Sequence, residues 1–81
     1  MTPKITQAKY VENYKLYLYF SDGSEGEINL EPELTGEIFE PLKDISFFKR
    51  FSVNHEIHAL LWPNGADFAP EFLYENMKII A

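Results

Sequence analysis

The sequence predicts an α+β fold in which antiparallel hairpins form a sheet and short helices pack on it. Apolar and polar residues alternate over 15–30 on both sides of a turn, and a second pair of apolar runs spans 51–62. Pro32 and Pro41 interrupt the middle of the chain, so only short helical segments fit there. We expect both hairpins to lie in one sheet that these segments cover on one face.

In the first predicted hairpin, alternate side chains point to the core and to the outer face of the sheet. Residues 5–12 are suited to a strand that precedes it, and Asn13-Tyr14 offers a turn between them. The inward positions of the hairpin are apolar: Leu16, Leu18, Phe20, Ile28 and Leu30. The outward positions are Lys15, Tyr17, Tyr19, Glu25, Glu27 and Asn29.

The loop of this hairpin decides which residues lie opposite each other. A two-residue loop at Asp22-Gly23 would set Phe20 against Glu25 and direct a carboxylate toward the core. A three-residue loop at 21–23 keeps apolar residues together and places Gly23 where left-handed backbone is favoured. A loop at 22–24 keeps the same faces without that role for Gly23. We favour the loop at 21–23, which pairs Leu16 with Ile28, Leu18 with Gly26, Tyr17 with Glu27, and Tyr19 with Glu25.

The second half of the chain contains shorter elements. Asp44 is suited to cap a helix over 45–50, and the second hairpin is expected to turn at Asn54-His55. Trp62-Pro63-Asn64-Gly65 ends that hairpin, and Pro70 is suited to the first position of a last helix. The expected core of the fold is Leu16, Leu18, Phe20, Ile28, Leu30, Phe39, Leu42, Phe48, Val53, Ile57, Leu61 and Leu73.

Length and composition limit the class of protein. The 81 residues have room for one domain, so we expect a single domain over 1–81. The net charge of −6 disfavours nucleic acid and suits a basic protein partner. There is no cysteine, no apolar run that could cross a membrane and no signal peptide, from which we expect a cytoplasmic protein that does not bind membranes.

No group of residues specifies a reaction. His55 is expected in a turn and His58 on a strand, an arrangement that does not converge on a metal ion. The many carboxylates lack a sign of an apolar pocket, and no nucleophile or phosphate-binding motif is present. We therefore expect no catalytic residues, no metal, no cofactor and no enzyme activity. Asp67 is expected to accept backbone N–H groups, and Trp62 to anchor the core.

Several short motifs together resemble a known bacterial family. They include Phe20-Ser21-Asp22-Gly23, Trp62-Pro63-Asn64-Gly65-Ala66-Asp67, Pro70-Glu71 and Leu73-Tyr74, and they resemble domain of unknown function 2442 over nearly the whole chain. Asn29 stands where that family commonly has Asp. The resemblance implies a small antiparallel α+β domain without established enzyme activity, and it implies an antitoxin-like role beside a small partner protein.

These observations favour a small protein-binding module, an antitoxin-like partner of a small basic protein. The expected contact residues are Tyr17, Tyr19, Glu25 and Glu27, because tyrosine gives rigid contact area and carboxylates attract Lys and Arg. The motif residues are assigned structural roles: Asp22, Gly23, Trp62, Pro63, Asn64, Gly65, Asp67, Pro70 and Tyr74. One alternative is a nucleic-acid-binding regulator that uses Lys49-Arg50. Another is a small-ligand binder or an enzyme near Trp62 and Asp67.

Overall fold

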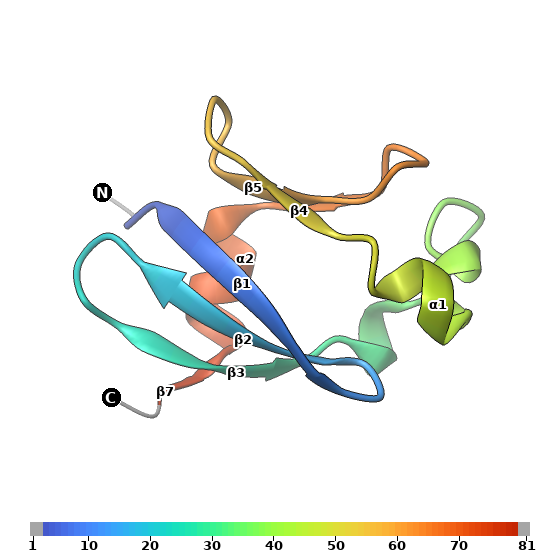
Figure 1. Ribbon diagram of the computed structural model, residues 1–81, viewed down its shortest axis with the longest axis horizontal. Coiled ribbons are helices and arrows are strands. Elements are labelled where there is room, and N and C mark those ends of the chain that lie inside the picture. Colours follow the sequence, from blue (N-terminus) through green and yellow to red (C-terminus); the bar gives the residue numbers. More distant parts are fainter. Residues whose placement is uncertain (1–2, 80–81) are drawn as a thin grey trace.

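The computed structural model describes residues 3–79 and confirms an α+β fold with antiparallel sheets (Figure 1). The first sheet has the order β1-β2-β3-β7, and the second has the order β4-β5-β6. The strands are β1 Ile5–Glu12, β2 Lys15–Phe20, β3 Glu25–Asn29, β4 Ser52–Asn54, β5 Ala59–Leu61, β6 Asp67–Phe68 and β7 Lys78–Ile79. The helical segments are η1 Glu31–Glu33, η2 Glu40–Lys43, α1 Ile45–Phe48 and α2 Pro70–Asn76.

The expectation of one sheet for both hairpins is wrong, because each hairpin belongs to a sheet of its own. The four-stranded sheet and the three-stranded sheet meet near β1 and β4, and α2 lies behind the larger sheet in Figure 1. Inward side chains from both sheets form one hydrophobic cluster with side chains from α1 and α2. Its members include Leu16, Leu18, Phe48, Leu60, Trp62 and Leu73.

The register of the first hairpin is confirmed. Leu16 lies opposite Ile28, and Leu18 lies opposite Gly26. The Phe20 N–H donates to the Ser24 carbonyl at 2.9 Å, which closes a three-residue loop at 21–23. Gly23 has a φ of +88°, so the loop has the left-handed residue that its type requires.

The register of the second hairpin differs from the prediction. The turn covers residues 55–58 and not Asn54-His55 alone, and Val53 pairs with Leu60. Ile57 lies in this turn and is 57% exposed, whereas Leu60 is fully buried. Leu60 therefore occupies the core in place of Ile57, and Leu61 is only partly buried. Phe39 and Val53 pack against the core while remaining partly exposed.

Both helix starts that the sequence indicates are confirmed. Asp44 caps α1 by accepting a hydrogen bond from the Ser46 N–H at 3.0 Å. The helix ends at Phe48 and is shorter than the expected span of 45–50. Pro70 occupies the first turn of α2, where its missing N–H costs no hydrogen bond. Within residues 3–79, no helix combines the length and apolar character that spanning a membrane requires.

The last strand, β7, approaches the sheet closely at Gly26. β7 pairs with β3, and Gly26 lies opposite Ile79. A Cβ atom at Gly26 would lie 2.3 Å from the Lys78 carbonyl oxygen, which is closer than atoms can approach. Gly26 thus allows the chain leaving α2 to pass from the inner side of the sheet to its edge.

Candidate functional site

The outer face of the four-stranded sheet brings the predicted contact residues together. Tyr17 lies opposite Glu27 and Tyr19 lies opposite Glu25, as expected. The two tyrosine rings meet edge to face, with 5.1 Å between their centroids. In Figure 1 this face is turned toward the viewer, and no helix or strand of residues 3–79 lies in front of it. All four side chains are partly exposed, so the face is open to contact.

Hydrogen bonding holds one of these rings in place. The Tyr17 hydroxyl donates to Glu25 Oε1 at 2.8 Å, on the diagonal between neighbouring strands. This hydrogen bond to the carboxylate is the main reason that the pKa of Tyr17 is raised to about 12, since losing the proton would leave two anions side by side. The hydroxyl of Tyr17 therefore keeps its proton to a higher pH than an ordinary tyrosine does.

The charges on this face are mixed. Lys9 Nζ lies 5.5 Å from the centre of the Tyr19 ring, and Lys15 Nζ lies 4.0 Å from Glu27 Oε1. Lys78 is the register partner of Glu27 on the other side. Glu25 and Glu27 therefore already have polar or basic neighbours within the protein. The alternation over 15–20 placed Lys15 on this face, but Lys9 and Lys78 become visible only from the pairing of β1 and β7.

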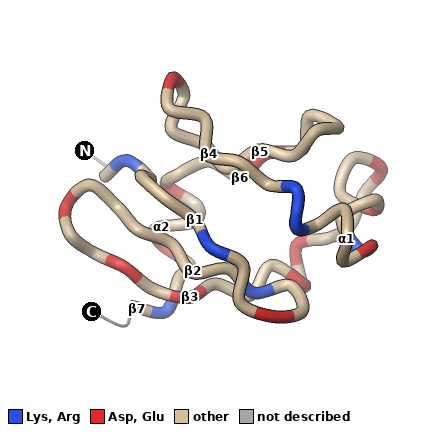
Figure 2. Tube along the Cα trace, in the orientation of Figure 1, with Lys and Arg blue, Asp and Glu red and all other residues tan. Residues whose placement is uncertain are grey.

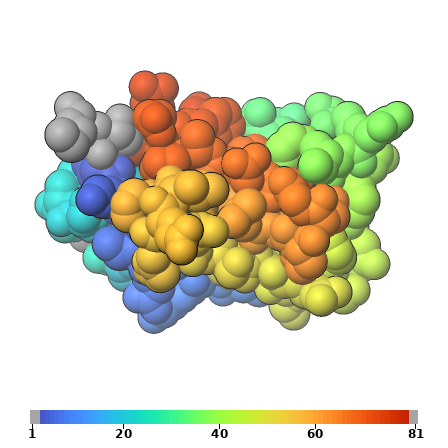
Figure 3. Space-filling model, turned by 90° about the horizontal axis from the view of Figure 1, so that it is seen from above, coloured from blue at the N-terminus to red at the C-terminus, as the bar shows by residue number. Residues whose placement is uncertain are grey.

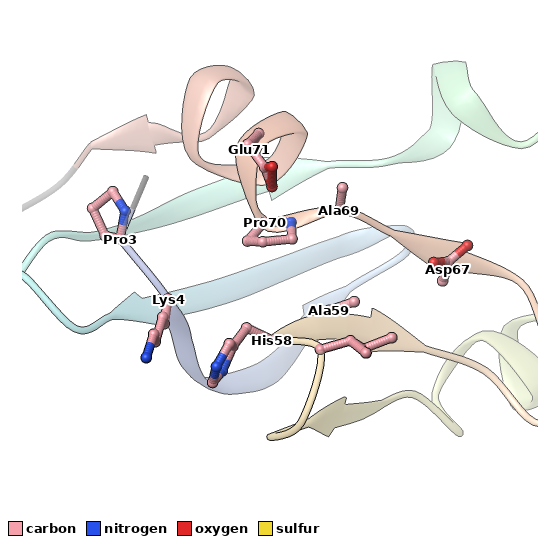
Figure 4. A pocket seen from close by; sticks show the side chains of 9 residues that line it. Pro3, Lys4, His58, Ala59, Asp67, Ala69, Pro70 and Glu71 are labelled. Carbon is pink, nitrogen blue, oxygen red and sulfur yellow. The ribbon is translucent and has the colours of Figure 1, made fainter. Parts of the chain in front are cut away.

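A separate hollow opens beside the start of β1 (Figure 4). It has a volume of about 500 Å³ and is lined by Pro3, Lys4, Ile57, His58, Ala59, Asp67, Ala69, Pro70 and Glu71. Figure 3 shows the turn between β4 and β5 standing out from the same side of the molecule. His58 has a φ of +55° in this turn, so its predicted place on a strand is wrong.

Trp62 and Asp67 lie in different surroundings. Trp62 is 3% exposed, and its Nε1 donates to the Phe48 carbonyl at 2.7 Å, so it anchors the core as expected. Asp67 lies exposed on β6 at the wall of the hollow, where Trp62 is not a lining residue. The backbone acceptor in this loop is Asn64, whose Oδ1 receives the Ala66 N–H at 3.1 Å, so the capping role predicted for Asp67 is corrected to Asn64.

The remaining motif residues form two loops of the same design. Gly23 and Gly65 both have positive φ, and each donates its N–H to the aromatic residue three positions earlier, Phe20 or Trp62. Asp22 and Asn64 occupy the middle of these loops and accept the N–H two residues later. Pro63 begins the second loop, and Tyr74 of α2 donates its hydroxyl hydrogen bond to Asp22.

No group of three or more His, Asp or Glu side chains within residues 3–79 is arranged to hold a metal ion. Asn29 Oδ1 accepts the Glu31 N–H at 3.1 Å. An amide oxygen is sufficient for this contact, so the departure from Asp at this position leaves the start of η1 satisfied.

The sequence matches a protein family over most of its length. The family described as "Protein of unknown function (DUF2442)" matches residues 5–78, which run from β1 to β7. This chain belongs to the DUF2442 family. The comparison with curated proteins found no match, and the comparison with solved structures found none. The match to DUF2442 covers both loops of aromatic, Asp or Asn, and Gly residues, and it covers Tyr74, which joins one of them to α2.

Proposed function

We propose that this DUF2442 chain is a protein-binding module, and that it acts as an antitoxin-like partner of a small basic protein. The observation that carries the proposal is the packed pair of Tyr17 and Tyr19 on a sheet face that no element of residues 3–79 covers. Paired tyrosines offer rigid, amphipathic contact area at a low cost in side-chain entropy. Such rings are enriched at protein interfaces relative to the rest of the surface.

The negative net charge of the chain supports a basic partner, because electrostatic attraction acts over a long range. The chain carries 13 acidic and 7 basic residues, so its overall field attracts a cationic protein. On the face itself, Glu25 accepts a hydrogen bond from Tyr17, and Glu27 lies near Lys15. We therefore assign the close contact to the two rings, and the preference for a basic partner to the whole surface.

The test is capture of the native partner from the host by an affinity-tagged chain, with the bound protein identified by mass spectrometry. Tyr17→Ala with Tyr19→Ala should abolish capture while the far-ultraviolet circular dichroism of the free chain remains unchanged. Ile57→Ala serves as the control, because it removes an exposed apolar side chain from the turn between β4 and β5, which belong to the other sheet. We call the sheet face that carries Tyr17 and Tyr19 the tyrosine face. Undiminished capture by the double variant would show that the partner does not bind to the tyrosine face.

A further inference from the structure

Three segments that lie far apart in the sequence form the hollow beside the start of β1. They are the residues before β1, the turn between β4 and β5, and the stretch from β6 into α2. The Ser21 N–H donates to the Lys4 carbonyl at 2.8 Å, and Asn54 Oδ1 accepts the Ile57 N–H at 3.1 Å, so hydrogen bonds hold the first two segments. The pairing of β6 with β5 holds the third. The hollow is therefore formed before any ligand arrives, which lowers the entropy lost on binding.

Much of the lining of the hollow is apolar. Pro3, Ile57, Ala59, Ala69 and Pro70 contribute carbon surface from all three segments. Ile57 is 57% exposed, so its side chain is available to an apolar ligand. The volume of about 500 Å³ lies within the range of small-molecule sites, which combine apolar walls with a few polar groups.

Polar groups of both kinds surround this apolar surface. Lys4 brings an ammonium group and His58 brings a ring N–H donor, whereas Asp67 and Glu71 bring carboxylates. In the view of Figure 4, Lys4 and His58 lie on one side of Pro70, and Glu71 lies on the other. The blue segment beside the label N in Figure 2 is Lys4. A ligand in the hollow therefore meets a basic side and an acidic side.

The charged groups of the hollow do not pair with each other. The ion pairs between described residues join Lys15 to Glu27 and Lys43 to Glu40, and neither includes a residue that lines the hollow. The polar lining residues are all exposed or partly exposed. Both kinds of charge are therefore available to a ligand that lies between them.

We propose that the hollow binds a free dipeptide with apolar side chains. The carboxylate of the dipeptide pairs with the Lys4 ammonium and accepts a hydrogen bond from His58. Its ammonium group pairs with the carboxylates of Asp67 and Glu71. Its side chains cover the apolar surface around Ile57, which removes that surface from water. This site is separate from the tyrosine face and does not depend on the function proposed for that face.

The size and the charges of the hollow select this class of ligand. A volume of about 500 Å³ equals the liquid volume of about 17 water molecules, which is close to the number of non-hydrogen atoms in leucyl-leucine. A polyanion would meet Asp67 and Glu71, and a polycation would meet Lys4. A ligand with one charge of each sign at its two ends and an apolar body satisfies every group.

The test is an NMR titration of the isotope-labelled chain with leucyl-leucine, followed through the amide chemical shifts. The shifts should concentrate at Lys4, His58 and Ala69, which belong to the three different segments. The dissociation constant should be about 0.1–1 mM, because an open hollow with exposed charges binds weakly. Binding should weaken further as salt is added.

Two capped ligands test the two sides of the hollow separately. Leucyl-leucine amide lacks the carboxylate that pairs with Lys4, and N-acetyl-leucyl-leucine lacks the ammonium group that pairs with Glu71. Each should bind the wild-type chain about two- to fivefold more weakly than leucyl-leucine, which is the effect of losing one exposed ion pair. Lys4→Gln should weaken the binding of leucyl-leucine by the same factor and leave the binding of the amide unchanged. Glu71→Gln should act in the same way with the acetylated ligand.

Matched controls separate these contacts from a general effect of charge. Lys43→Gln removes a lysine from η2, and Glu75→Gln removes a carboxylate from the helix that carries Glu71, but neither residue lines the hollow. Both controls should bind leucyl-leucine as the wild-type chain does. The comparison of capped ligands uses the wild-type chain, so it tests the proposal even if a variant folds poorly.

Four results would overturn the proposal. The first is that no amide of the hollow shifts on addition of leucyl-leucine. The second is that both capped ligands bind as tightly as the free dipeptide, and the third is that the controls lose as much affinity as Lys4→Gln and Glu71→Gln. The fourth is that free leucine binds more tightly than leucyl-leucine, which would show that the hollow is not matched to a dipeptide.

Discussion

The Tyr74 hydroxyl donates a hydrogen bond of 2.8 Å to Asp22 Oδ2, joining α2 to the loop of the first hairpin across 52 residues of sequence. The Tyr74 ring also packs edge to face on Phe20, with 5.1 Å between centroids. Two motifs that lie far apart in the sequence therefore meet in one contact. Asp22 additionally accepts the Ser24 N–H, so its carboxylate organises the loop and holds the helix.

This contact predicts a loss of stability in acid. The Ser24 N–H, followed by the Tyr74 hydroxyl, lowers the pKa of Asp22 in the folded chain. A carboxyl group with a lowered folded pKa stabilises the fold above its unfolded pKa, about 3.9, and loses that contribution as the pH falls through the folded value. Urea unfolding at neutral pH and at successively lower pH should show this decline. Asp22→Asn should flatten it, and an unchanged profile in that variant would contradict the assignment.

The two glycine loops predict a matched pair of substitutions. Gly23 and Gly65 have φ values of +88° and +90°, which residues with a Cβ atom adopt at a cost. Replacing either with Ala should lower the free energy of unfolding by about 1 kcal/mol or more. Asn tolerates left-handed backbone better, so Gly23→Asn should cost less than Gly23→Ala. Equal stability of the Ala and Asn variants, measured by denaturant unfolding, would show that φ is not the cause.

Gly26 predicts a different kind of effect, because space and not backbone angle is the constraint. A methyl group there would overlap the Lys78 carbonyl oxygen at 2.3 Å, so Gly26→Ala should displace β7 from β3. Amide hydrogen exchange should then accelerate at Lys78 and Ile79 while the pairing of β2 with β1 stays protected. Retained protection of β7 in the variant would mean that the Lys78 carbonyl does not lie against residue 26.

The corrected register of the second hairpin can be checked by two substitutions. Leu60 is fully buried, so Leu60→Ala should cost about 2–5 kcal/mol of unfolding free energy. Ile57 is 57% exposed in the turn, so Ile57→Ala should change stability by less than about 0.5 kcal/mol. Thermal and urea unfolding of both variants measure the difference. The reverse order would restore the register in which Ile57 faces the core.

The contrast between the two hairpins shows what local sequence determines. The first has clean alternation and a glycine at the one loop position that needs positive φ, so faces, loop and pairing were all predictable. The turn at 55–58 has no glycine, and His58 takes the left-handed conformation instead. Asn54 Oδ1 accepts the N–H groups of Glu56 and Ile57, which holds a longer turn than Asn54-His55 suggested.

Features that depend on tertiary contact were not predictable from local pattern. β6 and β7 are two residues long, and each exists because a neighbouring strand edge receives it. The tyrosine face was predicted from alternation, because successive residues of a strand point to opposite sides. β1 is also in contact with β4, and no pattern in the sequence indicates that these two strands adjoin.

The hydrogen bond between Tyr17 and Glu25 gives the last prediction. It raises the pKa of Tyr17 to about 12, so an ultraviolet titration of the folded chain should show one tyrosine that ionises well above the ordinary value of about 10. A raised folded pKa stabilises the fold fully below the unfolded pKa and loses that contribution as the pH rises toward 12. Glu25→Gln removes the carboxylate that opposes ionisation, so the late transition should move down toward pH 10. Tyr17→Phe should remove the late transition altogether and identify its source. If the transition persists in Tyr17→Phe, another hydroxyl is responsible, and the packed arrangement of the tyrosine face must be revised.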